Sequence, residues 1–122
     1  MIDKNQTYAV IGASTDEKKY GYQVLKDLHD AGYKVIPINP KGGEILGLKV
    51  YPDIKNVPEK IDVAIFVVPP AVTESILPQV KALAIKKVWL QPGSESAAAI
   101  KYCQANGLDC AHDACIMIER AN

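Results

Sequence analysis

Short apolar runs alternate with segments of helical spacing along the chain, and this alternation constrains the fold more than any other feature of the sequence. Five runs are expected to form strands: 7–11, 34–38, 61–68, 87–90 and 109–111. Largely apolar runs of this length are typical of strands buried on both faces of a parallel sheet. Strands that alternate with helices imply right-handed βαβ units. The pattern therefore predicts an α/β fold built on a parallel sheet.

Helical spacing fills the gaps between these strands. Helices are expected over residues 21–31, over residues 71–84, and from a cap at Ser94 to about Asn106. The second helix is predicted to bury one face, formed by Val72, Ile76, Val80 and Leu83. Pro37, inside the second strand, indicates either an irregularity of the strand or an edge of the sheet. Together these elements predict a Rossmann-like, doubly wound, five-stranded parallel sheet with helices on both faces.

Length and composition narrow the class further. The 122 residues suffice for a single domain, 1–122, and are too few for two. Fourteen basic residues balance fourteen acidic ones, so no overall field attracts nucleic acid or an anionic membrane. No run approaches the roughly 20 apolar residues of a membrane helix. Three cysteines without a C-x-x-C pair favour reduced thiols in the cytoplasm over disulfides, and no metal site is expected.

The loop after the first strand has the composition of a phosphate-binding turn. Ligands of open parallel sheets lie across the carboxyl ends of the strands. There Gly12 lets the chain turn without a Cβ, and the amides of Ala13 and Ser14 can face a phosphate. Gly21 opens a helix whose amino end attracts anions, and Lys19 can neutralise a diphosphate. A plain βα turn with exposed lysines explains the same residues, and this alternative stays open.

The loop after the second strand bears on the choice of nucleotide. An NAD site usually has an acidic residue at the end of this strand, where this chain has Asn39 followed by Pro40 and Lys41. Loss of the acid and gain of a cation suit a phosphorylated ribose, such as the 3′-phosphate of coenzyme A or the 2′-phosphate of NADP. The next glycine after Gly12 is Gly21, so this loop lacks the G-x-G-x-x-G motif of dinucleotide-binding sites. A solvated Asn-Pro-Lys turn is the alternative reading of these residues.

Two later loops complete this edge of the predicted sheet. Val68 and Pro69 end the third strand and would set an apolar strand end against a cofactor. Composition alone also explains them as strand terminators. Gln91, Pro92 and Gly93 lead to another helix, and Gly93 permits a close approach of the ligand to the backbone.

Taken in order, these loops resemble a known family over nearly the whole chain. The matching segments are 10–14, 19–22, 35–40, 67–69, 88–93 and 112–117. They are similar to the small single-domain CoA-binding proteins and to the CoA-binding domain of the succinyl-CoA synthetase α subunit. The resemblance implies that coenzyme A, free or acylated, lies over the carboxyl edge of the sheet.

The resemblance also implies places for particular residues. It puts loop 12–14 and Lys19 at the diphosphate, Asn39 and Lys41 near the adenosine and its phosphate, and residues 68–69 along the adenine or the pantetheine. The residues expected to bind the cofactor are Gly12, Ala13, Ser14, Lys19, Tyr20, Gly21, Asn39, Pro40, Lys41, Val68, Pro69, Gln91, Pro92, Gly93 and Cys115.

Cys115 is the candidate for chemistry. It follows the last strand, where a thiolate near the thiol end of the cofactor could form a mixed disulfide or accept an acyl group. Packing as a small hydrophobic residue is the alternative. His112 and Asp113 lie close in sequence, which does not establish a Cys-His-Asp arrangement. Neither His29 nor His112 has the context of the synthetases' phosphohistidine, so synthetase activity is not implied.

The sequence therefore favours a binding module over an enzyme. The expected function is non-catalytic binding, sensing or delivery of coenzyme A. The alternatives are an NAD(P)-binding redox sensor, an acyl- or thiol-transfer enzyme that uses Cys115, and an interaction subunit with an empty pocket. Self-association or a protein partner is left open.

Overall fold

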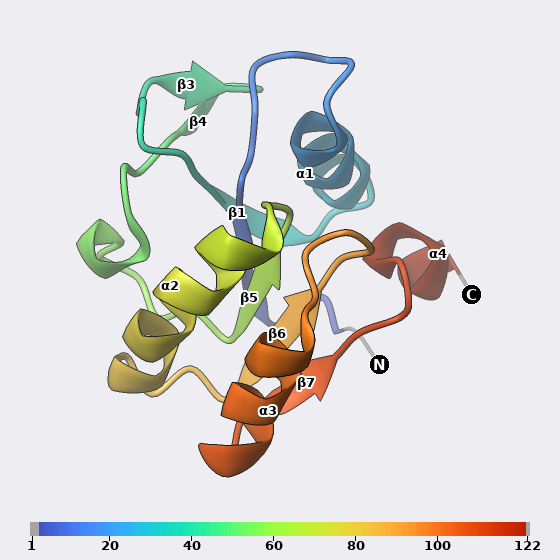
Figure 1. The fold of residues 1–122 in the computed structure, drawn as a ribbon. Helices are drawn as coiled ribbons and strands as arrows, with labels where there is room; N and C mark the ends of the chain where they lie inside the picture. Colours follow the sequence, from blue (N-terminus) through green and yellow to red (C-terminus); the bar gives the residue numbers. More distant parts are fainter. Residues whose placement is uncertain (1–2, 122) are drawn as a thin grey trace.

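The computed structural model describes residues 3–121 and contains the predicted five-stranded parallel sheet (Figure 1). The strands are β1 (Thr7–Ile11), β2 (Lys34–Ile38), β5 (Val63–Phe66), β6 (Lys87–Leu90) and β7 (Asp109–Ala111). Their order is β2-β1-β5-β6-β7, and each neighbouring pair is parallel. β5 is shorter than the predicted run 61–68, although the N–H groups of Asp62 and Val67 still bond to β1.

Pro37 lies in β2, which is an edge strand, one of the two predicted alternatives. The carbonyl of Pro37 faces away from β1 and accepts the N–H of Tyr51 at 3.1 Å. The nitrogen of a strand residue points to the same side as its carbonyl, so the missing N–H costs no hydrogen bond to β1.

Helices cover both faces of the sheet (Figure 1). The helices are α1 (Tyr20–Asp30), α2 (Pro70–Ala82), α3 (Ala97–Ala105) and α4 (Ile116–Ala121). α2 and α3 pack on one face, and α1 and α4 on the other. In β1, Ala9 and Ile11 belong to the core beneath α2 and α3, whereas Tyr8 and Val10 belong to the core beneath α1. This alternation confirms the doubly wound, Rossmann-like fold.

The buried face of α2 differs from the predicted one and is shifted by about one residue along the helix. Thr73, Leu77 and Val80 are buried, while Val72 and Leu83 are 38% and 43% exposed. Val80 is the only residue shared by the two sets. Because a helix turns about 100° per residue, both sets are spaced like a single face, and hydrophobicity alone could not distinguish them. Val72 instead lines a groove at the carboxyl edge of the sheet.

The start of α3 also differs from the prediction. Ser96, not Ser94, caps this helix, and its Oγ accepts the N–H of Ala99 at 3.0 Å. Ser94 is buried and its Oγ accepts the N–H of Val68 at 3.0 Å. It therefore joins the loops that follow β5 and β6. Cys103 lies on α3. After β7 the chain forms the short helix α4, an element that the sequence pattern did not indicate.

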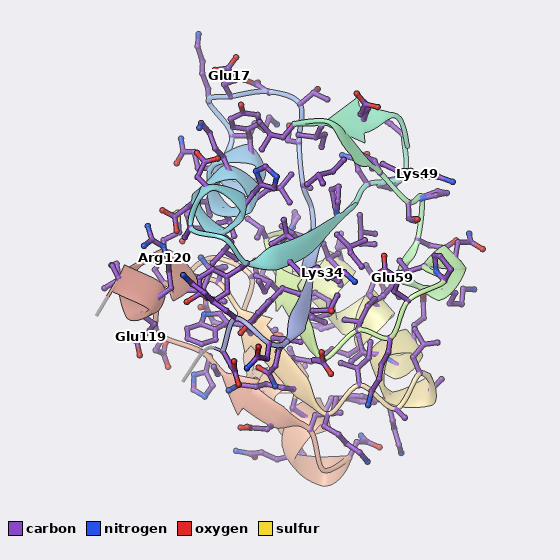
Figure 2. The ribbon with its side chains drawn as sticks, turned by 180° about the vertical axis from the view of Figure 1, so that it is seen from behind. Glu17, Lys34, Lys49, Glu59, Glu119 and Arg120 are labelled. Carbon is purple, nitrogen blue, oxygen red and sulfur yellow. The ribbon has the colours of Figure 1, made fainter. Side chains whose placement is uncertain are left out.

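Two small elements and two ion pairs complete the fold. The small elements are the hairpin of β3 (Glu44–Ile45) and β4 (Leu48–Lys49) and the 3₁₀ turn η1 (Ile54–Asn56). Lys34 at the start of β2 pairs with Glu59, and the two lie side by side in Figure 2. Arg120 of α4 donates two hydrogen bonds to the carboxylate of Asp27 in α1, both of 2.8 Å. No helix within residues 3–121 is long and apolar enough to cross a bilayer.

Candidate functional site

The glycine turn after β1 is pressed between two other segments of backbone. Gly12 has φ +98°, and a Cβ on it would lie 2.2 Å from the carbonyl oxygen of Val67. A Cβ on Gly21 would lie 1.9 Å from the carbonyl oxygen of Gly12. The sequence suggested that Gly12 permits a turn. The structure adds that both glycines are needed for close packing of β5, the turn and α1.

The amino end of α1 faces this turn. Lys19 is the N-cap residue, and no side chain caps the helix. The amides at the start of the helix therefore carry the partial positive charge that attracts anions. Lys19 is exposed, and Ser14 is half-buried with its Oγ accepting the N–H of Asp16 at 3.0 Å. A phosphate at this place would meet backbone N–H groups, a helix end and an ammonium group.

Asn39 joins the loops after β1 and β2. Its Nδ2 donates to the carbonyl of Ala13 at 2.7 Å, and its Oδ1 accepts the N–H of Lys41 at 2.9 Å. Asn39 is half-buried, while Pro40 and Lys41 are exposed. The amide of Asn39 therefore positions the turn, and Lys41 is the exposed charge at the end of β2.

An apolar groove of about 250 Å³ lies between the carboxyl ends of β1 and β2, η1 and α2. Its lining residues are Ile11, Gly12, Ile38, Pro40, Pro52, Asp53, Ile54, Val68, Val72, Ile76 and Gln79. Three of them, Gly12, Pro40 and Val68, were predicted to bind the cofactor. Sequence reasoning missed the role of Val72 and Ile76 in this groove: Val72 is exposed, while Ile76 is partly buried and packs against the core as well.

A second groove, of about 420 Å³, adjoins the first. We call it the proline groove, because its lining residues are Tyr20, Val67, Val68, Pro69, Pro70, Pro92, Gly93 and Ser94. Val68 lines both grooves, so they meet at the carboxyl end of β5. The fold thereby brings together predicted residues from the loops after β5 and β6 and the start of α1.

Cys115 lies in a polar cluster with Tyr20 and Gln91. The hydroxyl of Tyr20 donates to Cys115 Sγ at 3.1 Å. Gln91 is fully buried, and its Nε2 donates to the Tyr20 hydroxyl at 2.6 Å and to Cys115 Sγ at 3.4 Å. The Oε1 of Gln91 accepts the N–H of Ile116 at 2.8 Å. Trp89 also bonds to the loop between β7 and α4, since its Nε1 donates to the carbonyl of residue 114 at 2.9 Å.

These contacts change the acidity of the groups in the cluster. Burial opposes ionisation of Cys115, but hydrogen bonds from Tyr20, Gln91 and the amides of α4 outweigh it and lower the pKa of the thiol. Burial and the hydrogen bond to Cys115 raise the pKa of Tyr20 above its usual value. The phenol therefore stays protonated and remains a donor to the sulfur.

The other candidate groups are arranged differently. His112 Nδ1 lies 2.6 Å from Asp113 Oδ2, whereas the side chains bonded to Cys115 are Tyr20 and Gln91. A Cys-His-Asp arrangement is therefore not what holds the thiol. Within residues 3–121, no three His, Cys, Asp or Glu side chains are grouped as metal ligands.

The proteins that resemble this chain in sequence and structure include ADP-forming CoA ligases and proteins described as hypothetical. The chain is 43% identical over 76 residues to the ADP-forming acetate–CoA ligase of Methanocaldococcus jannaschii, a match that covers 62% of this chain and 11% of that protein. The matched part is thus about a tenth of that curated relative. The dinucleotide forming acetyl-coenzyme A synthetase 1 of Ca. Korarchaeum cryptofilum superimposes with a TM-score of 0.76 at 31% identity, over 86% of this chain and 25% of that one.

A protein of nearly the same size has the same fold. It is a conserved hypothetical protein from Pyrococcus furiosus, with a TM-score of 0.89 and 38% identity over 93% of this chain and 98% of that one. A family model described as "CoA binding domain" matches residues 6–121. That range includes the glycine turn, both grooves and the Cys115 cluster. The resemblance deduced from the ordered loops is confirmed: this chain belongs to the family of CoA binding domains.

Proposed function

We propose that this chain binds coenzyme A, free or acylated, as a non-catalytic module for sensing, storage or delivery. The observation that carries the proposal is that the apolar groove and the proline groove meet at Val68, beside the turn at Gly12. Coenzyme A has an adenine at one end, a diphosphate in the middle and a thiol-ended pantetheine arm. The site has a feature that suits each part. The apolar groove suits the adenine, the turn at Gly12 suits the diphosphate, and the proline groove, which Tyr20 links to Cys115, suits the pantetheine arm.

In the proposed complex the adenine occupies the apolar groove, between Pro40 and the residues of α2 at its far wall. The diphosphate lies against Gly12, Ala13 and Ser14 and the start of α1, where Lys19 adds charge. The pantetheine follows the proline groove past Pro69 and Gly93 towards Tyr20. Each residue so used lines a groove or belongs to the turn between the two grooves.

The loop after β2 supports coenzyme A over NAD. The side chain of Asn39 is already bonded to the backbone of Ala13 and Lys41, so it is not available to hold two ribose hydroxyls. Lys41 is the exposed cation at this place and would pair with a phosphate on the ribose. Coenzyme A carries that phosphate at the 3′ position and NADP at the 2′ position, so an experiment must separate them.

The proposal of a non-catalytic role follows from the donors in the site. The proposed contacts are mostly backbone amides, prolines, apolar side chains and exposed lysines, and the carboxylate of Asp53 in the apolar groove is engaged as the cap of η1. We further propose that the protein works in the cytoplasm, where its three free thiols stay reduced. It would then hold coenzyme A alone, or present it to a second copy or another protein.

Thermal unfolding with coenzyme A, dephospho-CoA, NAD, NADP and ATP tests the proposal. Saturation at about 100 times the dissociation constant stabilises the folded state by about 2.7 kcal/mol, which raises the Tm by on the order of 10 °C. We expect coenzyme A to give this shift and dephospho-CoA a smaller one. A strong response to NADP with none to coenzyme A would contradict the proposal.

A pair of lysine variants tests the phosphate contact. Lys41→Gln should bind coenzyme A and dephospho-CoA with equal affinity, since it lacks the charge that distinguishes them. Lys101→Gln, an exposed residue of α3, is the matched control and should keep the preference for coenzyme A. If Lys41→Gln keeps that preference, Lys41 does not bind the 3′-phosphate.

A further inference from the structure

We propose that Cys115 is a site of reversible mixed-disulfide formation with the thiol end of coenzyme A, and that Tyr20 and Gln91 position its sulfur for this exchange. The inference rests on the proposed function, because it requires the pantetheine arm to lie in the proline groove. It adds a substrate class, the disulfides of coenzyme A, and a residue that reacts with them.

Tyr20 connects the groove to the sulfur. It is one of the residues that line the proline groove, and its hydroxyl lies 3.1 Å from Cys115 Sγ. A ligand arm that runs along this groove to Tyr20 therefore ends beside Cys115. Cys115 is half-buried and does not itself line the groove, so Tyr20 is the side chain that links the groove to the sulfur.

The donors around the sulfur suit an attacking thiolate. Gln91 donates to the Tyr20 hydroxyl at 2.6 Å, and that hydroxyl donates to the sulfur. A second donor, Gln91 Nε2, lies 3.4 Å from the same sulfur. Hydrogen bonds to a thiolate favour the charged form, and the pKa of Cys115 is lowered despite its burial. The cluster thus raises the population of the nucleophile without a neighbouring histidine.

The other two cysteines lack this arrangement. Cys103 is buried in α3, and Cys110 in β7 shares a hydrogen bond with it on the opposite face of the sheet. That hydrogen bond and burial raise the pKa of Cys110. Cys110 is partly buried like Cys115, so it provides a control thiol in a different electrostatic setting.

The exchange balances in atoms and electrons. The Cys115 thiolate attacks one sulfur of the disulfide formed by two coenzyme A molecules. A bond forms between Sγ and that sulfur while the disulfide bond breaks, and the departing coenzyme A leaves as a thiolate that takes a proton from water. Cys115 is oxidised and one coenzyme A is reduced. A free thiol reverses the step by attacking the mixed disulfide.

The test uses the full reduced chain and coenzyme A disulfide, with intact mass as the readout. We expect one coenzyme A moiety to be added and to be removed by dithiothreitol. Cys115→Ser should form no adduct, and Cys110→Ser should form it at the parental rate. Hydroxyethyl disulfide, which lacks the nucleotide, should react more slowly than coenzyme A disulfide, and reduced coenzyme A should slow the latter by competition.

Tyr20→Phe tests the positioning role, because it keeps the ring that lines the groove and removes the hydroxyl. The thiolate population falls when this donor is lost, while the more basic thiolate is a better nucleophile. The net effect expected at pH 7 is a rate about threefold lower, with the pH–rate profile moved to higher pH. An unchanged profile would overturn the role of Tyr20.

Calorimetric titration of Cys115→Ser with reduced coenzyme A separates this inference from the proposed function. Binding of reduced coenzyme A together with no adduct on the parent chain overturns the inference and leaves the proposed function standing. Equal rates with hydroxyethyl disulfide and coenzyme A disulfide overturn the inference as well, because Cys115 would then be an ordinary accessible thiol. No binding of reduced coenzyme A overturns both.

Discussion

Replacement of Gly21 by alanine tests the packing on which the site depends. Gly21 lies in the first turn of α1, and its Cβ would lie 1.9 Å from the carbonyl oxygen of Gly12. Real Cβ atoms essentially never approach closer than 3.0 Å, so the helix and the turn would have to separate by about 1.1 Å. The obstructing atoms belong to the backbone, so no change of side-chain rotamer relieves the contact.

Two effects of opposite sign compete in this variant. Alanine is favoured over glycine inside a helix by about 1 kcal/mol, so helix propensity alone predicts a more stable protein. Overpacking costs about 1–3 kcal/mol where side chains can adjust, and more where backbone must move. We therefore expect Gly21→Ala to lose about 2–4 kcal/mol of unfolding free energy. In a domain of this size the Tm should fall by about 10 °C.

Thermal unfolding followed by circular dichroism, with Gly47→Ala as the control, measures the effect. Gly47 has φ +75° in the hairpin loop and no atom within 4 Å of an added Cβ, so its substitution carries only the cost of the backbone conformation, roughly 1–2 kcal/mol. Titration with coenzyme A should show weaker binding for Gly21→Ala and unchanged binding for Gly47→Ala. A Tm of Gly21→Ala at or above that of the parent chain would refute the packing argument.

Three further predictions concern the grooves, the loops and the thiols. Val72→Asn should weaken coenzyme A binding about tenfold by calorimetry, because it removes apolar surface from the groove, whereas Leu83→Asn at the other end of α2 should not. Asn39→Ala should lower the unfolding free energy by about 1–2 kcal/mol in urea, since it removes one hydrogen bond between two loops and one within the loop after β2; an unchanged urea midpoint would show that they contribute nothing. Alkylation by iodoacetamide should label Cys115 at lower pH than Cys110, because the pKa of the first is lowered and that of the second raised; the reverse order in peptide mapping would contradict the described contacts. The lowered pKa of Cys115 also adds stability above the pKa of the unfolded chain, and this contribution disappears as the pH falls through the folded-state pKa.

The sheet could be predicted from the sequence because its strands are apolar almost throughout and bounded by glycine or proline. Pro37 indicated an irregularity or an edge, and the structure has the edge, where the missing N–H of proline removes no bond to β1. The face of α2 could not be predicted in the same way. Two sets of residues on this helix have helical spacing: the predicted set at positions 72, 76, 80 and 83, and the buried set at positions 73, 77 and 80. Two apolar residues of the predicted set, Val72 and Ile76, line the groove.

The loops of the site could be located, but not the roles of their side chains. The position of Asn39 near the adenosine stays a prediction, and the structure adds that its amide is bonded to the neighbouring loop. Ser94 was expected to cap a helix, and it bonds the end of β5 instead. Neither bond could be predicted from the sequence, for the same reason. A polar residue in a loop can bond to any nearby backbone group, and the choice depends on which strands are neighbours in the sheet.

Hydrogen bonds between the loops also determine which polar groups of the site are free to contact a ligand. Asn39, Ser94 and Gln91 each connect a loop at the carboxyl edge to the backbone of another segment, at Ala13, Val68 and Ile116 respectively. Their polar atoms are engaged in bonds between loops, so backbone amides, apolar side chains and exposed ammonium groups are the contacts that the proposed complex uses. Such groups suit a phosphorylated ligand with an apolar arm. In this setting the sulfur of Cys115 accepts hydrogen bonds from Tyr20 and Gln91, and these contacts are the reason that we propose it, rather than Cys110, as the thiol that exchanges with a ligand disulfide.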